Sequence, residues 1–333
     1  MIRRFYLILS IILVLPLLVS FDPVTTNSNY YAKYRSPEGI QFLSYSSEWD
    51  EDKLQGLYEE LIQNKHGEEI MFLQEVKVVG EGLGEYPHAD YYAKAVYQSL
   101  TSSITLFHGN KYTEPHLYRE TLAHEYGHHF AYHHFPGHHF PFSKWSQLRG
   151  LELNTVRWDA FWNYSLDAYS LFPQEIIADD YLLLYGATSK VDLKDVLSHE
   201  AFYTMTMHDN QQIPNVFEST ELHSYFEDKT GFQIDKNRLL NTPILEEKNH
   251  NTLTFKVVDR SDVAYRLNVK LYKENSLIAD ERLIAITPED SDGKIQFTLA
   301  GLNRADFIEA NFSILDLNTS IGFETDTFML KLN

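Results

Sequence analysis

The sequence predicts an α+β protein with two parts, a mixed α/β domain over residues 25–248 and an antiparallel β-sandwich over residues 249–333. A chain of 333 residues, of which 44% are hydrophobic, is long enough to form two separate cores. Up to about residue 248, helical spacing of apolar residues predominates, with a few strand-like runs. From about Asn251 apolar and polar residues alternate instead, which is typical of antiparallel strands.

The first part contains a helix that carries most of the histidines. Seven of the fifteen histidines lie between Leu122 and Phe140. Glu114 and Pro115 form a helix start signal, and Pro136 and Gly137 form a stop signal, so the spacing predicts a helix over 114–135. The same reasoning predicts helices at 48–63 and 173–186 and strands at 69–80 and 102–110.

The second part consists of short segments in which apolar and polar residues alternate with a period of two residues. Leu253, Phe255 and Val257 alternate with threonine and lysine, and the next runs behave in the same way. We expect strands at 252–258, 264–273, 276–286, 294–300, 308–315 and 327–332. Roughly seven short strands separated by turn signals predict a sandwich of immunoglobulin or fibronectin type.

Charge and composition exclude several classes of function. The chain has 47 acidic and 28 basic residues, a formal net charge of -19, so most of its surface would repel a nucleic acid. We therefore expect no nucleic-acid partner. The chain has no cysteine, which excludes disulfides, thiolate metal sites and a cysteine nucleophile. Any metal ion must be held by histidine and carboxylate.

Residues 1–24 have the layout of a targeting segment. Arg3 and Arg4 precede an apolar run from Phe5 to about Phe21, as in the basic and apolar regions of a secretory leader. The cleavage site is weakly marked and the run is long enough to cross a bilayer, so an uncleaved membrane anchor remains open. We expect an exported protein, either secreted or anchored at the outer face of the cytoplasmic membrane.

Within the histidine-rich helix, one pair of histidines is accompanied by a suitable base. His124 and His128 are four residues apart, so they share one helix face and reach a single ion. Glu125 follows the first of them and completes the pattern H-E-x-x-H. Zinc held by two imidazoles lowers the pKa of a bound water, and an adjacent carboxylate accepts its proton. The pair His129 and His133 has the same spacing but no adjacent base.

The HEYGH motif and a later segment, EIIAD at 175–179, together resemble the gluzincin metallopeptidases. Glu175 and Asp179 lie one turn apart on one face of their predicted helix. The resemblance implies that Glu175 is the third zinc ligand and that Asp179 accepts a hydrogen bond from a ligand histidine. It covers these two motifs and the strand and helix before them. The neighbouring Asp180 leaves open which aspartate faces the site.

The resemblance implies a peptidase with a zincin-like catalytic domain, and the N-terminal segment implies that this peptidase is exported. Its cofactor would be Zn²⁺, held by the two motif histidines and Glu175, and its substrate a peptide or a protein. Glu125 would activate the water and then protonate the leaving amine. The run at 102–110 could serve as the sheet edge to which an extended substrate adds as a strand.

Two alternatives remain open at this point. A metzincin would use His134 as third ligand, but the glycine that turns its chain is replaced by Ala131, whose side chain disfavours a positive φ. A non-catalytic, histidine-rich metal-binding protein of the cell surface would bind several ions. For the peptidase we expect the five remaining histidines of the cluster to be solvent-facing or in loops. Candidate donors to the oxyanion are Tyr185, His199, Tyr203, His208 and His223.

Overall fold

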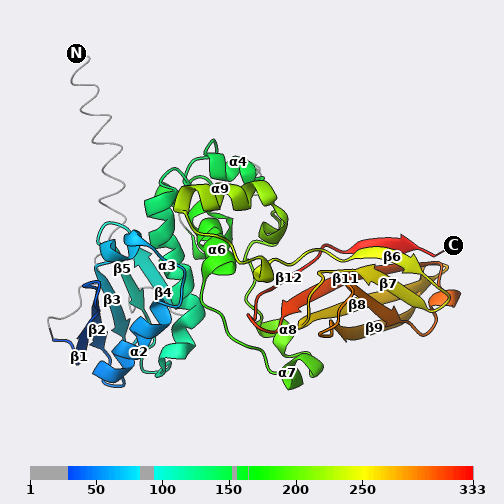
Figure 1. Ribbon diagram of the computed structural model, residues 1–333, viewed down its shortest axis with the longest axis horizontal. Coiled ribbons are helices and arrows are strands. Elements are labelled where there is room, and N and C mark those ends of the chain that lie inside the picture. Colours follow the sequence, from blue (N-terminus) through cyan, green and yellow to red (C-terminus); the bar gives the residue numbers. More distant parts are fainter. Residues whose placement is uncertain (1–28, 83–93, 152–155, 164, 333) are drawn as a thin grey trace, which may run out of the picture. The chain divides into compact units, whose positions relative to one another are not determined.

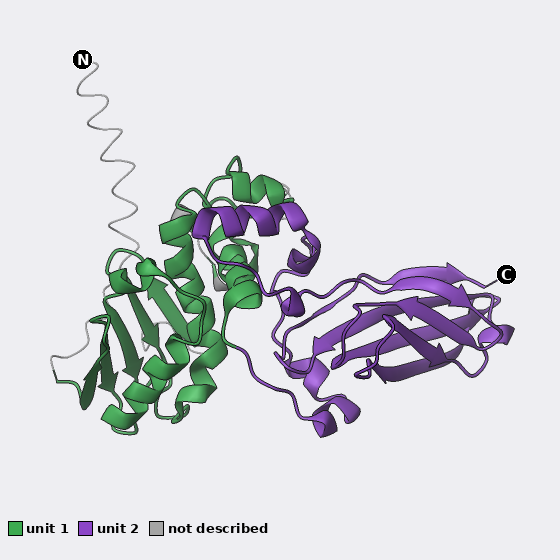
Figure 2. Cartoon of the chain, viewed as in Figure 1, with its two compact units in different colours: residues 1–187 green, residues 188–333 purple. Residues whose placement is uncertain are grey.

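The computed structural model describes residues 29–82, 94–151, 156–163 and 165–332. It is an α+β structure, as predicted: a region with a mixed sheet and helices is followed by antiparallel sheets. The chain divides into two compact units, residues 1–187 and 188–333 (Figure 2). The predicted boundary at residue 248 falls inside the second unit and stays a prediction.

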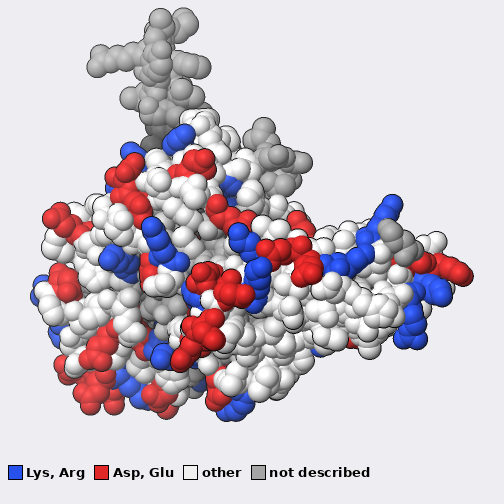
Figure 3. Space-filling view, turned by 45° about the vertical axis from the view of Figure 1, so that its right-hand side comes forward, with Lys and Arg blue, Asp and Glu red and all other residues white. Residues whose placement is uncertain are grey.

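The predicted leader or anchor at 1–24 lies outside the described residues. Among the residues that are described, no helix combines the length and the apolar character needed to cross a membrane. Acidic and basic side chains are interspersed over the face shown in Figure 3, and the basic ones do not join into a continuous patch on that face.

The first unit is built around a five-stranded sheet with the strand order β1-β2-β3-β5-β4. The three inner strands are parallel, and both outer strands run antiparallel to their neighbours. Helix α2 packs on the β1 and β2 side, and α3 on the β5 and β4 side (Figure 1). The strands are β1 Ala32–Arg35, β2 Gln41–Tyr45, β3 Glu75–Val79, β4 Ala95–Gln98 and β5 Ser103–Leu106.

The helices of this unit follow the sequence signals closely. Asp50 caps α2 by accepting from the Lys53 N–H, as expected of a polar residue at a helix start. The predicted helix 114–135 begins as a 3-10 turn and continues as α3, whereas the predicted strand 69–80 is a 3-10 turn followed by β3. The helices are α2 Glu51–Leu61, η1 Glu68–Phe72, η2 Pro115–Tyr118, α3 Arg119–His134, α4 Lys144–Leu148, α5 Ala160–Asn163, η3 Leu166–Leu171 and α6 Pro173–Tyr185.

Helices α3 and α6 approach each other closely at Gly127. A Cβ atom at this position would lie 2.8 Å from the Ala178 carbonyl oxygen and 3.0 Å from its Cα. Because those contacts involve backbone, they do not yield as a flexible side chain would. The absence of a side chain at Gly127 therefore sets the separation of the two helices.

The second unit contains two antiparallel sheets with a shared aromatic core. One sheet has the order β10-β7-β6, the other β12-β11-β8-β9, with β13 also paired to β11. Phe255 and Phe297 of the first sheet pack against Phe312 of the second, with ring centroids 4.9 and 5.9 Å apart. The strands are β6 Ile244–Lys248, β7 Thr252–Lys256, β8 Val263–Lys273, β9 Ser276–Ile286, β10 Lys294–Thr298, β11 Phe307–Asp316, β12 Gly322–Glu324 and β13 Phe328–Lys331.

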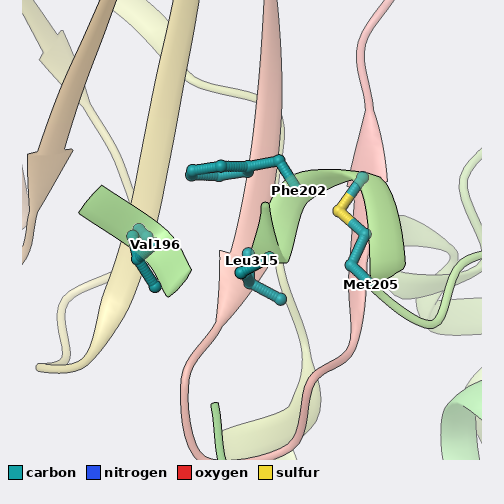
Figure 4. Packing of buried hydrophobic residues seen from close by; sticks show 6 residues of the cluster. Val196, Phe202, Met205 and Leu315 are labelled. Carbon is teal, nitrogen blue, oxygen red and sulfur yellow. The ribbon is translucent and has the colours of Figure 1, made fainter. Parts of the chain in front are cut away.

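Two short helices cover one end of the larger sheet. Val196 of α7 (Leu193–Leu197) and Phe202 of α8 (Ala201–Thr204) join Met205 and Leu315 in a buried apolar cluster (Figure 4). At its margin the guanidinium of Arg266 lies 4.7 Å from the Phe202 ring centre. The other helices of this unit are η4 Val216–Glu218, α9 Thr220–Thr230, η5 Lys236–Arg238 and η6 Leu302–Arg304.

Candidate metal centre

The three predicted zinc ligands come together between α3 and α6. His124 Nε2 and His128 Nε2 each lie 3.3 Å from the same oxygen of Glu175, Oε2. One ligand atom from each residue lies within 4.8 Å of the others, which makes the three a group that could hold a metal ion. His128 and Glu175 are buried, and His124 is partly exposed.

Asp179 determines which nitrogen of His124 faces the group. The Asp179 carboxylate accepts from His124 Nδ1–H at 2.8 Å. In the neutral ring, Nε2 then carries a lone pair and faces the Glu175 oxygen, which also offers only lone pairs. Two acceptors in this position require a cation between them or a proton on the ring. The donor set, two imidazoles and a carboxylate, is one that zinc takes readily.

The ionisation of the group agrees with this need for positive charge. Burial alone would raise the pKa of Glu175, but the charge of His128 and hydrogen bonds from both histidines lower it well below its ordinary range. Burial alone would lower the pKa of His124, but hydrogen bonds to Asp179 and Glu175 raise it well above its ordinary value. The Glu175 carboxylate therefore stays ionised and attracts a cation.

Asp180, the alternative to Asp179, points into a different part of the fold. Its carboxylate accepts from Trp145 Nε1 at 3.1 Å and from Arg149 Nε at 2.9 Å. Both partners are almost fully buried, as is Asp180 itself. This ion pair fixes α6 against α4 and leaves Asp179 to face His124.

Glu125, the predicted base, is buried beside the ligands. Burial raises the pKa of its carboxyl, and the charge of Glu175 adds to this, while both histidines oppose it. Its Oε2 atom is buried and has no hydrogen-bond partner among the described residues. A buried acceptor of this kind is placed to take a bond from a water molecule.

The remaining histidines of the cluster differ from what the sequence led us to expect. His129 is buried on α3, so the expectation that it faces solvent or lies in a loop is wrong. His138 is also buried, but it lies in a turn after the helix. His134 lies at the end of α3, with Nε2 3.3 Å from Glu69 Oε2. The helix continues without a turn through Ala131, so His134 is not among the groups that meet at Glu175.

Of the candidate donors to the oxyanion, Tyr185 lies in the first unit and the other four lie in the second. Tyr185 is buried in the core at the end of α6, with its ring 5.9 Å from that of Phe130. His199, Tyr203, His208 and His223 belong to the second unit, and their role stays a prediction. The strand predicted as a substrate edge, 102–110, is β5, which lies between β3 and β4, so that assignment is wrong. The sheet edge next to α3 is β4.

Tyr97 on β4 is the residue at the site that sequence reasoning missed. Its ring stacks on the ring of His128 at 6.2 Å with an interplanar angle of 10°. Its hydroxyl lies 3.1 Å from His129 Nδ1. The four-residue strand is too short to show an alternation, and only the pairing of β4 with β5 brings it to α3.

Glu69 is a buried carboxylate that supports the back of α3. It accepts from the Tyr126 hydroxyl, the Gly67 N–H and His134 Nε2. Burial alone would raise its pKa, but these hydrogen bonds, that of His134 foremost, lower the pKa from 4.5 to about 2.

Replacement of Glu69 by Gln will therefore cost stability in a pH-dependent way. A carboxyl whose pKa is lowered by folding stabilises the folded state at pH values above its ordinary pKa of 4.5. This stabilisation is lost as the pH falls toward about 2. We expect Glu69→Gln to lower the free energy of unfolding by about 2 kcal/mol at pH 7 and by progressively less below pH 4.5. Urea unfolding at several pH values measures this. The exposed neighbour Glu68, changed to Gln, is the control. An equal loss in the free energy of unfolding at every pH would contradict a stabilising role for the charge of Glu69.

Gly127→Ala will test whether the helix contact holds the ligand group together. Alanine is intrinsically the better helix former by about 1 kcal/mol, so an unhindered site would gain stability. Because the added Cβ would meet the Ala178 backbone, we expect instead a loss of about 1–3 kcal/mol and weaker zinc binding. Thermal unfolding and a zinc titration give both values. A variant more stable than the wild type would show that α3 and α6 separate freely.

The chain has little similarity to known proteins. No protein-family profile matches it, and no curated protein sequence matches it. A solved structure that it matches is aminopeptidase A of Legionella pneumophila in complex with aspartic acid, with 14% sequence identity and a TM-score of 0.23. The match covers 81% of this chain and 35% of that chain, so this chain spans about a third of that protein.

Proposed function

We propose that the protein is an exported zinc-dependent peptidase. The observation that carries the proposal is the meeting of His124, His128 and Glu175 beside the buried carboxylate of Glu125. The two histidines and Glu175 would hold the zinc ion, and Asp179 would orient His124. When bound, zinc would act as a Lewis acid and lower the pKa of a coordinated water.

In the proposed reaction, Glu125 moves the proton. Its Oε2, which has no hydrogen-bond partner among the residues that the structure describes, accepts a proton from the water as the water oxygen forms a bond to the peptide carbonyl carbon. Glu125 then gives the proton to the amine nitrogen as the C–N bond breaks. Burial favours this role, because it raises the pKa of the carboxyl toward the range in which a group both accepts and releases a proton.

The two alternatives receive less support from the contacts of the histidines. A metzincin site needs His134, but its Nε2 is bonded to Glu69. A site for several ions needs many free imidazoles, but His129 is also engaged, with Nε2 2.7 Å from the Glu69 carbonyl oxygen. We therefore propose one zinc ion per chain. Export, and secretion or anchoring through residues 1–24, are proposed from Arg3, Arg4 and the apolar run that follows.

The proposal is tested with the full chain loaded with zinc. It is incubated with a broad mixture of peptides, and new termini are identified by mass spectrometry, with and without a chelator. Cleavage that the chelator stops and added zinc restores supports the peptidase. Metal analysis showing well over one ion per chain, without any cleavage, would favour the non-catalytic metal-binding protein.

A further inference from the structure

Strand β9 forms one edge of the larger sheet in the second unit (Figure 1). In the order β12-β11-β8-β9 it pairs, among the described strands, with β8 alone. It is eleven residues long, and none of these residues is buried. Leu277 and Ile278 are 52% and 42% exposed. A long edge strand of this kind offers a row of main-chain donors and acceptors to another strand.

The pairing with β8 determines which main-chain groups of β9 point outward. The Thr287 N–H, just after β9, donates to the Val263 carbonyl at 3.0 Å. Because hydrogen-bonded and non-hydrogen-bonded pairs alternate along antiparallel strands, Arg282 and Asp280 then direct their N–H and C=O groups away from β8. Within the described part of the chain, no other element supplies a partner for these groups. The outer edge of β9 is therefore available for pairing.

The middle of β9 carries charges of both signs. Asp280 and Arg282 are exposed and, two residues apart, lie on the same face of the strand. Arg282 donates a bond to the Tyr203 hydroxyl at 3.2 Å, and neither charged residue forms an ion pair with a residue that the structure describes. Like charges on an edge repel a second copy of the same strand, whereas Asp280 and Arg282 can each meet the opposite charge.

The charges favour one register for two antiparallel copies of β9. Outward-facing residues of one copy must pair with outward-facing residues of the other, so the two-fold axis falls on a residue. With the axis at Glu281, Asp280 of each copy lies opposite Arg282 of the other. Moving the axis by one residue to either side sets two Arg282 or two Asp280 side chains against each other, which is unfavourable.

We propose that two copies of the chain associate through β9, antiparallel around a two-fold axis at Glu281, so that their larger sheets join into one. The same surface serves both copies, as in other two-fold interfaces. The axis also brings Glu281 next to its own counterpart, a like-charge contact that weakens the dimer. The ion pairs of Asp280 with Arg282 set the register, and Glu281 limits the affinity. Association of this kind is independent of the proposed peptidase activity.

Cross-linking through a single introduced cysteine tests the position of the axis, because the chain has no other cysteine. In Glu281→Cys the two Cα atoms would lie about 4.5 Å apart, within reach of a disulfide. We expect most of the full chain to form a covalent dimer on mild oxidation. The matched control is Leu277→Cys, exposed on the same strand, whose two copies would lie about 27 Å apart across the axis. Equal cross-linking of both variants would overturn the proposal.

Charge reversal tests the register. Asp280→Arg and Arg282→Asp each set like charges opposite each other, so each will raise the dimer dissociation constant, measured by sedimentation of the full chain, by about tenfold or more. The variant with both substitutions restores opposite charges and will return within about threefold of the wild type. Glu281→Gln removes the like-charge contact and will tighten the dimer.

Three results would overturn the dimer. One is a wild type that stays monomeric at high micromolar concentration. Another is a doubly reversed variant that associates as weakly as the single ones. The third is an association that none of the substitutions at Asp280, Glu281 and Arg282 alters, because such an association would use another part of the chain. All three variants change residues outside the buried core, so circular dichroism should show the wild-type fold in each.

Discussion

Glu125→Gln will retain zinc and lose peptide hydrolysis by about a thousandfold in kcat. Glutamine has nearly the same shape, so the packing beside His124 and His128 is preserved, and neither histidine changes. What is lost is the group that, in the proposed mechanism, accepts the proton of the water and returns it to the leaving amine. Steady-state kinetics on a cleaved peptide and metal analysis of the same sample measure the two properties separately.

The control for this experiment is Glu120→Gln, the same substitution at an exposed position in the first turn of α3. We expect it to leave kcat within about twofold of the wild type, since it lies outside the site. A Glu125→Gln variant that retains wild-type kcat would remove Glu125 from the mechanism. Loss of zinc together with activity would instead give Glu125 a role in holding the ion.

Glu175→Ala will weaken zinc binding by about a hundredfold or more. Removal of the carboxylate leaves the two histidines as the remaining proposed ligands and takes away the negative charge that both Nε2 atoms face at 3.3 Å. The affinity is measured by competition with a chromogenic chelator at constant pH. Activity at a limiting zinc concentration should fall in parallel.

His134→Ala is the matched control for the choice of third ligand. It removes a histidine from the same cluster, but one bonded to Glu69, so we expect unchanged zinc affinity with a modest loss of stability. The opposite pattern, tight binding in Glu175→Ala and weak binding in His134→Ala, would contradict the ligand set proposed here and support the metzincin alternative.

The parts of the site that could be predicted from the sequence depend on local geometry. Helical periodicity determines that His124 and His128 share a face, and that Glu175 and Asp179 do so on the second helix. A start signal at Pro173 places the second helix correctly. Alternation likewise predicted antiparallel strands of the second unit such as β10, in which one face is buried and the other is exposed.

The parts that could not be predicted depend on contacts between distant residues. His129 is polar and adjacent to a ligand, but its burial follows from a partner sixty residues earlier, the carbonyl of Glu69. The order β5-β4 at the sheet edge follows from strand pairing, which four residues with no clear alternation do not specify. The sequence therefore did not predict the role of Tyr97, although its ring contacts those of His128, His129 and Tyr132 on α3.

The two ligand helices meet without any covalent tie, since the chain has no cysteine. An ion shared by His128 and Glu175 would close the loop between α3 and α6 much as a disulfide does. Because it would bind the folded chain, zinc at a hundred times its dissociation constant would add about 2.7 kcal/mol to stability. If the chain is an exported peptidase, as proposed, its survival time would follow the local zinc supply, and a competing chelator would shorten its lifetime as well as stop its turnover.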